Sequence, residues 1–452
     1  MPLLSRAESQ FLRRHLAAAR QVTLRRADGC VVRLHLLPPR RPQPDLPFLL
    51  LRNGRDLLPL RLSWAILLAC WMEAVEPFAG RAMTKEEAAA ARADAIGAAA
   101  AVYHRTPPAQ IATDFDALLA TLLDVAGKTP LRLPEVELGA YARYMTAPLR
   151  MDLHISAMVK DGAWHCNQKC LHCYAARQLY AEAEELDTDQ WLAILEKCRT
   201  AGVPQLTFTG GEPTLRHDLV KLVAAAQWFV TRLNTNGRML TPGLCRDLCE
   251  AGLDAVQITL YAAEEEVHNE LAGAPGFADT VAGIRNAVAA GLNVSVYTPL
   301  CSLNRSYAAT VRLAASLGVR QAACGGLSPT GRAETAESAA TRLPPDALAA
   351  ALREGRAAAE AEGVALDFTS PGWLDDNALQ ALGFARPPRC GAGLANLAIA
   401  PDGKVLPCQS WLRGPAIGDI LHQPWPRIWN GTAARHIRRQ AAAMRPGCLL
   451  ER

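Results

Sequence analysis

From residue 148 to about residue 330 the sequence alternates between short apolar segments and longer segments with helical periodicity. Such alternation is typical of βα units, in which each strand returns to a parallel sheet through a helix. Six strands are predicted, at residues 150–158, 205–209, 229–234, 255–260, 293–299 and 320–324. The helices between them are expected at residues 188–200, 218–228, 241–251, 278–290 and 307–317.

Right-handed crossovers between consecutive parallel strands curl such a sheet into a closed or partial barrel. The predicted fold class is therefore α/β, with a partial, TIM-like (β/α)6 barrel over residues 148–345. In barrels of this kind the functional residues lie in the loops that follow the carboxyl ends of the strands. Those loops are the first place to search for chemistry.

The predicted barrel is flanked by segments of different character. Residues 1–147 predict a small α+β module, with a hairpin at 22–37 around the turn Asp28-Gly29, a proline-rich stretch at 38–44 and three helices at 60–75, 85–103 and 114–126. Residues 346–388 predict a helical connector, whose helix covers residues 344–363 and is followed by a short strand at 364–369. Residues 389–452 form a third segment, rich in Cys, Gly and Trp.

Composition limits the class of protein. Of the 452 residues, 50% are hydrophobic and 20% are charged, which are ordinary globular proportions. The formal net charge is only +4, so no nucleic-acid partner is expected, although residues 1–60 hold 11 Arg against 4 acidic residues and could attract an acidic partner. Charges interrupt the N-terminus where a secretory signal would be apolar, and the apolar run at 64–72 is far shorter than the roughly 20 residues of a membrane span. We therefore expect a cytoplasmic protein without a membrane partner.

Three of the 13 cysteines lie together in the loop after the first predicted strand. Cys166, Cys170 and Cys173 are spaced C-x3-C-x2-C, so one short loop carries three thiols. Three thiolates can bind three corners of a cubane iron–sulfur cluster and leave the fourth iron without a protein ligand. Zinc remains a formal alternative, because His165 and His172 accompany the cysteines.

The loop after the second predicted strand contains Gly210, Gly211, Glu212 and Pro213. Two consecutive glycines at a strand end let the backbone approach a ligand closely, and Glu212 adds an acceptor side chain. Together the two loops resemble those of the radical S-adenosylmethionine (SAM) enzymes. Their C-x3-C-x2-C and Gly-Gly-Glu-Pro motifs match the three cysteines and residues 210–213 residue for residue.

The resemblance implies a [4Fe-4S] cluster on the three cysteines, with the amino and carboxylate groups of SAM on its open iron. It also implies that residues 210–213 meet the SAM amino group and that His172 lies near the adenine. Asn234 and Asn236 after the third strand, and Thr259 at the end of the fourth, resemble polar positions that line the same pocket. The implied activity is reductive cleavage of SAM to a 5′-deoxyadenosyl radical that abstracts a hydrogen atom, with an electron donor such as flavodoxin or ferredoxin.

The C-terminal segment carries a second set of cysteines. Pro401-Asp402-Gly403 lies between two apolar alternating runs and predicts a hairpin that could bring Cys390 near Cys408. The pattern is similar to the start of the auxiliary-cluster domain known as SPASM, or to its shorter relative, the twitch domain. Only Cys448 follows, so we expect a single auxiliary iron–sulfur cluster on Cys390, Cys408 and Cys448. Its fourth site would be open, bound to substrate, or filled by a more distant residue such as Cys324; the alternative is three plain buried thiols.

Three functions stay open on the sequence alone. Radical SAM enzymes with such tails frequently mature ribosomally made peptides, and residues 111–119 loosely resemble the last helix of the peptide-recognition domains found in that setting. The N-terminal module would then grip a peptide, whereas the alternative is a scaffold that packs on the barrel. The second function is maturation of a small-molecule cofactor such as a tetrapyrrole. The third is a non-catalytic iron–sulfur protein that senses redox state or binds a ligand.

Overall fold

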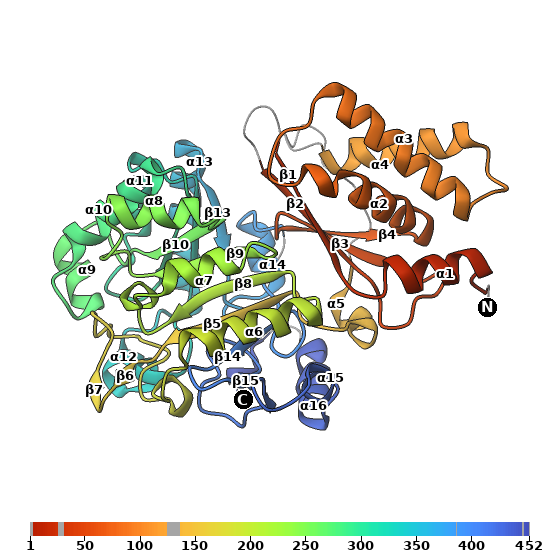
Figure 1. The fold of residues 1–452 in the computed structure, drawn as a ribbon. Coiled ribbons are helices and arrows are strands. Elements are labelled where there is room, and N and C mark those ends of the chain that lie inside the picture. Colours follow the sequence, from red (N-terminus) through yellow and green to blue (C-terminus); the bar gives the residue numbers. More distant parts are fainter. Residues whose placement is uncertain (1–2, 26–30, 124–135, 386, 445–446, 452) are drawn as a thin grey trace. The chain divides into compact units, whose positions relative to one another are not determined.

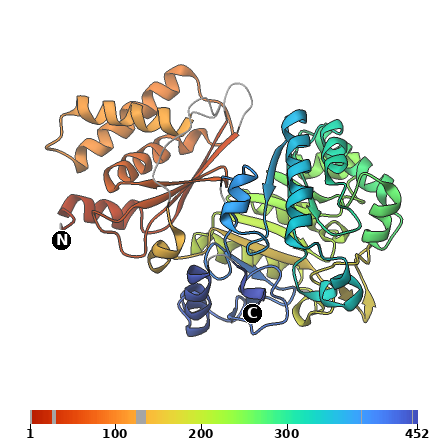
Figure 2. The same ribbon diagram turned by 180° about the vertical axis from the view of Figure 1, so that it is seen from behind.

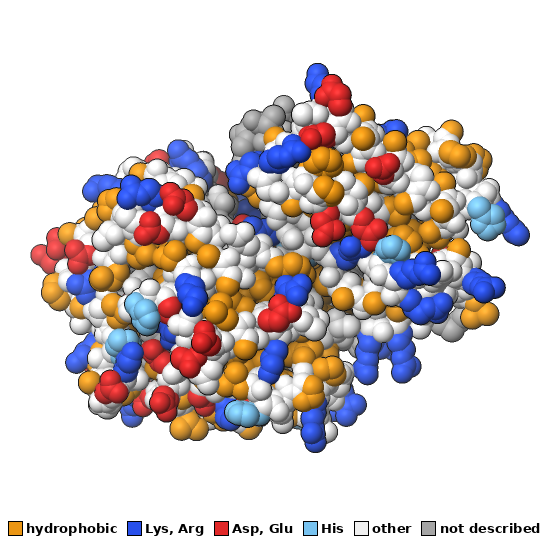
Figure 3. Space-filling view, viewed as in Figure 1, with side chains coloured by type: hydrophobic (Ala, Val, Ile, Leu, Met, Phe, Trp, Pro, Cys, Tyr) orange, Lys and Arg blue, Asp and Glu red, His pale blue; other side chains and the backbone are white. Residues whose placement is uncertain are grey.

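The structure is a computed structural model, and it describes residues 3–25, 31–123, 136–385, 387–444 and 447–451. The chain divides into two compact units (Figure 1). The first comprises Met1–Ala147 with Cys198–Pro204, and the second comprises Pro148–Lys197 with Gln205–Arg452. Figure 3 shows Lys and Arg side chains interspersed with Asp and Glu over the visible face of both units, in keeping with the small net charge. Every helix in the described ranges is too short or too polar to cross a lipid bilayer.

The second unit is built on a ten-stranded sheet, in the order β13-β12-β11-β10-β9-β8-β5-β14-β15-β16. All six predicted barrel strands are present, and each pairs in parallel with its neighbours among them. They are β5 (Arg150–Ser156), β8 (Gln205–Gly210), β9 (Val230–Thr235), β10 (Ala255–Thr259), β11 (Asn293–Pro299) and β12 (Gln321–Gly325). The predicted α/β fold class is confirmed.

The predicted crossover helices join these strands and cover one face of the sheet (Figures 1 and 2). They are α6 (Thr188–Ala201), α7 (Leu219–Ala225), α8 (Pro242–Glu250), α10 (Phe277–Ala289) and α11 (Tyr307–Ser316), with a further short helix α9 (Glu265–Ala272). Local sequence determines where α8 begins. The Thr241 side chain caps the helix by accepting a hydrogen bond from Leu244 N at 3.2 Å, and Pro242 occupies its first turn. Alternation along each strand leaves the opposite face of the sheet to polar side chains such as Asp152 and Thr207.

The sheet extends beyond the predicted barrel at both edges. After α13 (Pro345–Glu362), the short strand predicted in the connector is β13 (Ala365–Phe368), and it adds to β12 as a seventh parallel strand. At the other edge β14 (Asn396–Ile399) pairs in parallel with β5. The predicted Pro401-Asp402-Gly403 turn joins β14 to the antiparallel strand β15 (Lys404–Leu406), which in turn pairs with β16 (Gly418–Asp419). The C-terminal segment is therefore continuous with the barrel sheet.

Short elements complete the second unit. The strands β6 (Val159–Lys160) and β7 (Ala163–Trp164) form a small hairpin directly before the first cysteine. The other short elements are η3 (Leu179–Ala181), η4 (Pro213–Leu215), η5 (Gly331–Glu334), α12 (Ala336–Ala340), α14 (Asp376–Ala381), α15 (Trp425–Trp429), α16 (Thr432–Ala443) and η6 (Leu449–Glu451).

The first unit contains a four-stranded antiparallel sheet in the order β1-β2-β3-β4. The predicted hairpin is β1 (Arg20–Arg25) paired with β2 (Val31–Leu37), and its turn Asp28-Gly29 lies outside the described residues. A second hairpin, β3 (Phe48–Arg52) with β4 (Asp56–Leu60), was not predicted. Its turn is Asn53-Gly54, whose positive φ angles of 50° and 67° are those of a tight hairpin turn.

The helices of the first unit pack around one apolar core. The apolar run at residues 64–72 lies in α2 (Leu62–Val75), which is buried round most of its surface against α3 (Lys85–Val102), α4 (Pro108–Leu123) and the sheet. An additional helix, α1 (Arg6–His15), begins with a capping box between Ser5 and Glu8. The other elements are η1 (Glu76–Phe78), α5 (Leu138–Tyr141) and η2 (Ala142–Tyr144). The helix predicted at residues 114–126 corresponds to α4, which begins six residues earlier, at Pro108. Residues 124–126 of the prediction lie outside the described ranges.

Candidate functional site

A cavity of about 590 Å³ lies on the polar face of the barrel sheet. Its wall includes both predicted sets of cysteines, although they are more than 200 residues apart in the chain. Pro213 is absent from this wall, because it is buried at the start of η4. The predicted residues in the wall are Cys166, Cys170, Cys173, Cys390, Cys408, Cys448, His172, Gly210, Gly211, Glu212, Asn234, Asn236 and Thr259.

The loop with the first three cysteines is held by backbone hydrogen bonds on one side. Lys169 N donates to Ala272 O at 3.1 Å, and Leu171 N donates to Leu271 O at 2.9 Å, both at the end of α9. Gly273 has a φ of +61°, and a Cβ there would stand 2.3 Å from Lys169 O. The close approach of α9 to the cysteine loop therefore requires glycine at this position.

Residues 330–341, here named the clamp segment, hold the same loop from another side. Arg332 N donates to Cys173 O at 2.9 Å, and Ser338 Oγ donates to Leu171 O at 2.8 Å. The Arg332 guanidinium also donates to Cys170 O at 3.2 Å. Gly331, with a φ of +63°, permits this contact, because a Cβ would stand 2.5 Å from Cys173 O. The clamp segment was missed in the sequence, since nothing local marks its role.

The three loop thiols are partly buried and close enough to influence one another. Burial and the neighbouring thiol of Cys173 raise the pKa of the Cys170 thiol to about 12, against the opposing effects of the Tyr261 hydroxyl and Arg332. Burial likewise raises the pKa of Cys166 and of Cys173. A bound metal reverses this effect, because its positive charge deprotonates coordinating thiols. Desolvated, convergent thiols are therefore a donor set that fits an iron cluster.

The arrangement of the three loop thiols fits cluster ligands and not ligands to a single metal ion. Within the residues that the structure describes, no three His, Cys, Asp or Glu side chains are grouped as ligands of a single metal ion. The three thiolates of a cubane bind three different irons, and so they stand farther apart than the ligands of one ion.

The two glycines of the second motif are required by packing. Gly210 has a φ of +136°, and a Cβ at this position would lie 2.1 Å from Ser156 O. A Cβ on Gly211 would lie 2.5 Å from Ala157 O. The loop after β8 therefore lies directly on the end of β5, and this contact, as well as the ligand contact expected from the sequence, accounts for glycine here.

Glu212 ties the loops after β8 and β9 together. Its carboxylate is 1% exposed; Oε1 accepts from the Thr214 hydroxyl, from Thr214 N at 3.0 Å and from Thr235 Oγ1 at 2.7 Å. Oε2 accepts from Asn236 N at 2.9 Å, which leaves it able to accept a further hydrogen bond. Burial raises the pKa of this carboxyl, and the hydrogen bonds from Asn236, Thr214 and Thr235 oppose the rise.

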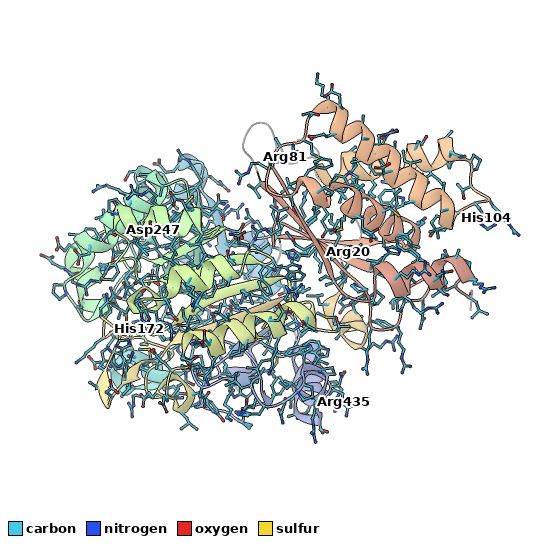
Figure 4. All side chains as sticks on the ribbon, viewed as in Figure 1. Arg20, Arg81, His104, His172, Asp247 and Arg435 are labelled. Carbon is cyan, nitrogen blue, oxygen red and sulfur yellow. The ribbon has the colours of Figure 1, made fainter. Side chains whose placement is uncertain are left out.

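Among the described residues of the cavity wall, His172 and Asn234 each have a buried polar atom without a hydrogen-bond partner. His172, labelled in Figure 4, bonds through Nε2 to Thr341 Oγ1 at 2.8 Å, but its Nδ1 has no hydrogen-bond partner among the described residues. Burial lowers the pKa of His172 to about 4, so the ring is neutral at pH 7. Asn234 Oδ1 likewise has no partner in the described part of the chain. Unsatisfied buried atoms are costly, so both fit a bound polar molecule such as SAM.

The other two predicted residues, Asn236 and Thr259, differ in the hydrogen bonds that they already make within the protein. Asn236 Nδ2 donates to Asn167 Oδ1 at 2.6 Å, and its Oδ1 accepts from Arg238 N at 3.1 Å. Asn236 therefore links the cysteine loop to the loop after β9. Thr259 lies at the carboxyl end of β10, where its side chain lines the cavity.

The structure brings the three C-terminal cysteines together. The Cys448 thiol is hydrogen-bonded to that of Cys390, and both lie near the thiol of Cys408. Burial raises the pKa of Cys408 to about 12.

Cys324, the suggested fourth ligand, is not in the cavity wall. It is buried beside Tyr307, with its sulfur 3.9 Å from Asp367 O. The reason is the alternation along β12: a Cβ on the next residue, Gly325, would meet the hydroxyls of Tyr297 and Ser370 in the cavity wall, so Cys324 points to the other face of the sheet.

Sequence reasoning missed several aromatic residues in the wall. Tyr261, Tyr297 and Trp373 all line the cavity. Tyr261 follows β10, so a search of every loop after a strand would have found it. Trp373 follows β13, and its ring packs so closely on Gly326 that a Cβ there would lie 2.5 Å from the indole. It was missed because β13 was not assigned to the barrel.

Family models match two parts of the chain. The model of the radical SAM superfamily matches residues 165–314, and the model of an iron-sulfur cluster-binding domain, SPASM, matches residues 390–449. Both matches contain a cysteine set described above. The second match confirms the predicted resemblance of the C-terminal segment to SPASM domains.

Comparison with whole proteins agrees with the family models. The chain is 32% identical over 281 residues to a PqqA peptide cyclase of Ruegeria pomeroyi, an alignment that covers 60% of this chain and 71% of the relative. It is 30% identical over 303 residues to a PqqA peptide cyclase of Streptomyces rochei, covering 65% and 80%.

Solved structures show the same fold at low sequence identity. Streptococcus suis SuiB bound to the precursor peptide SuiA matches with a TM-score of 0.58, 14% identity and 87% coverage of both chains. The enzyme anSMEcpe with bound AdoMet matches with a TM-score of 0.52 and 13% identity, covering 65% of this chain and 84% of its own. From its relatives and its two matched domains, the chain belongs to the radical SAM superfamily, whose enzymes use a [4Fe-4S] cluster and SAM, and it has a SPASM iron–sulfur domain at its C-terminal end.

Proposed function

We propose that this radical SAM enzyme matures a ribosomally made peptide, and that its cavity holds both the reacting part of that peptide and SAM. The observation that carries the proposal is that two separate sets of three thiols line one cavity. The names of the relatives support the substrate class, because two of them are PqqA peptide cyclases and SuiB was solved with its precursor peptide SuiA.

In this proposal Cys166, Cys170 and Cys173 hold the SAM-binding cluster, and Cys390, Cys408 and Cys448 hold one auxiliary cluster. When bound, the first cluster and SAM supply one-electron cleavage of the sulfur–carbon bond and a radical able to abstract hydrogen. The protein contributes binding, orientation and exclusion of water.

Three groups in the wall are suited to orient SAM. Glu212 Oε2 can accept a hydrogen bond from an ammonium group, and the unpaired Asn234 Oδ1 can accept another from an N–H or hydroxyl group. The neutral His172 ring has Nδ1 free among the described contacts to bond an uncharged heterocycle. Glu212, Asn234 and the neutral His172 would hold SAM in the cavity through hydrogen bonds, and none of these three side chains carries a positive charge.

The side of the cavity formed by β11 and by the loop after β13 is suited to the substrate. Tyr297 and Trp373 line it together with hydroxyl groups of Thr369 and Ser370. Aromatic faces and hydroxyls bind extended peptide through apolar contact and hydrogen bonds. We infer that this wall holds the peptide side chain from which hydrogen is taken.

The test is an anaerobic turnover assay with the reconstituted protein, dithionite and SAM. Formation of 5′-deoxyadenosine is expected, and it should be abolished when Cys166, Cys170 and Cys173 are replaced by Ala. If a short open reading frame lies beside this gene, adding its peptide should give a product of changed mass. Deoxyadenosine without any change of the peptide would reject the peptide substrate, and no deoxyadenosine at all would reject turnover.

A further inference from the structure

Cys170 is distinguished from its two partners in the loop by the side chains around it. The Tyr261 side chain packs in the same apolar cluster as Cys170, and its hydroxyl lowers the pKa of that thiol, while the Arg332 guanidinium donates to the carbonyl oxygen of Cys170 at 3.2 Å. The side-chain oxygen of Gln168 lies 3.4 Å from the sulfur of Cys170. One corner of the loop therefore has a hydroxyl group and a full positive charge beside it.

The charge of Arg332 is held in place by several contacts. Its guanidinium lies over the indole of Trp164, 4.4 Å from the ring centre, and Trp164 Nε1 in turn donates to Gln168 O at 2.8 Å. The backbone N of Arg332 donates to Cys173 O at 2.9 Å. Because these contacts hold both the guanidinium and the backbone of Arg332, its positive charge is fixed in position.

The nearest acidic group in the clamp segment has its own partner. Glu334 pairs with Arg413 at 2.7 Å, and both side chains are substantially exposed to solvent. No ion pair between Arg332 and an acidic residue occurs in the described part of the chain. The guanidinium charge is therefore directed to the cysteine loop.

Tyr261 is fixed in the same manner. It is 6% exposed, its backbone N bonds to His268 Nδ1 at 3.3 Å, and its ring meets the His268 ring edge-on at 5.7 Å. This packing holds the side chain in the cluster that contacts Cys170.

The reduction potential of an iron–sulfur cluster depends on nearby charge and on hydrogen bonds to its sulfurs. Reduction adds one negative charge, so a fixed cation and a hydrogen-bond donor stabilise the reduced form. We propose that Arg332 and Tyr261 are positioning residues that raise the reduction potential of the SAM-binding cluster through Cys170. The inference rests on the proposed function, because it requires that cluster on the loop.

The experiment is a redox titration of the reconstituted holoenzyme, monitored by electron paramagnetic resonance. The signal to follow is the one that changes when SAM is added. In Arg332→Met the ratio of reduced to oxidised cluster at a fixed potential should fall about tenfold, as expected for a unit charge in partly screened surroundings, which corresponds to about 59 mV for one electron. Tyr261→Phe should shift the ratio in the same direction by a smaller factor. Arg332→Lys keeps the charge and should stay near the wild type.

Arg413→Met is the matched control, since it removes one exposed positive charge that pairs with Glu334 and, among the described residues, makes no hydrogen bond to the cysteine loop. A wild-type potential in both Arg332→Met and Tyr261→Phe, each at full iron content, would overturn the inference. An equal fall in Arg413→Met or in Arg332→Lys would also overturn it. If the wild type shows no SAM-responsive signal, the proposed function itself fails, so the two failures are distinguished.

Discussion

At the scale of single residues, Glu212 is constrained by donors on both of its oxygens. Thr214 N bonds to Oε1 and Asn236 N to Oε2, so an amide in either orientation would place an NH2 group against a backbone N–H. We therefore expect Glu212→Gln to lower the free energy of unfolding by ~1–3 kcal/mol. Affinity for SAM should fall as well. Thermal unfolding and SAM titration measure the two effects, and the exposed Glu334→Gln is a suitable control.

A second prediction concerns three buried histidines of the barrel, His154, His172 and His268. Burial lowers the pKa of each of them to about 4, against 6.5 for an ordinary histidine. All three are neutral in the folded protein at pH 5.5 but protonated once unfolded, so stability is full above pH 6.5 and is lost as pH falls toward 4.

Between pH 6 and 5 the free energy of unfolding should fall by up to about 4.1 kcal/mol per pH unit, because three extra protons bind on unfolding. Chemical denaturation at several pH values gives this slope. His268→Gln should lower the slope by about a third, whatever its effect on stability at pH 7. A flat profile in the wild type would contradict the prediction.

Residues that act through local spacing could be predicted from sequence, whereas residues that act across the fold could not. Cys166, Cys170 and Cys173 lie within eight positions, so their common loop is encoded directly. Arg332 reaches the same loop from about 160 residues away, and its contact depends on the path of the chain after β12. No sequence pattern short of the complete fold would place it there.

At the scale of elements, the contact between the clamp segment and the cysteine loop depends most directly on Gly331. Its φ is +63°, and a methyl group at this position would stand 2.4 Å from Tyr174 O and 2.5 Å from Cys173 O. Gly331→Ala should therefore combine backbone strain of about 1–3 kcal/mol with displacement of the cysteine loop. The iron bound after reconstitution should fall, as iron quantification would show.

Gly363 offers a matched control for that substitution. Its φ is +65°, but a Cβ there would meet nothing within 4 Å. Gly363→Ala should cost about 1–2 kcal/mol of stability and leave iron binding unchanged. Equal iron content in the two variants would show that the clamp segment does not hold the loop.

The elements that could be predicted are those with local periodicity. The six barrel strands and their helices each span a full strand or several helical turns, so the pattern is readable. The strands β13 and β14 are four residues each, and their place in the sheet depends on pairing with β12 and with β5. The Asn53-Gly54 hairpin is different, because its turn dipeptide is a local signal that the prediction overlooked.

At the scale of the whole molecule, the two sets of cysteines predict the iron content. Reconstituted protein should bind about eight irons per chain if both sets hold four-iron clusters, and about four if only one does. Replacing Cys390, Cys408 and Cys448 by Ala should remove about half of the iron. We expect that variant still to form deoxyadenosine from SAM, because the first cysteine loop keeps its own contacts. Unchanged iron content would reject the auxiliary cluster.

The last prediction concerns the first unit, which has its own sheet and apolar core. None of its described residues lines the cavity. If it grips the substrate peptide, deleting residues 1–145 should weaken binding of the precursor peptide at least tenfold, which is about 1.4 kcal/mol of binding free energy. Deoxyadenosine formation without peptide should persist, since the loops proposed to bind SAM lie in the other unit. Fluorescence anisotropy with a labelled precursor measures the first quantity and the anaerobic assay the second. Equal peptide affinity in an active truncated protein would assign the first unit to a scaffold role.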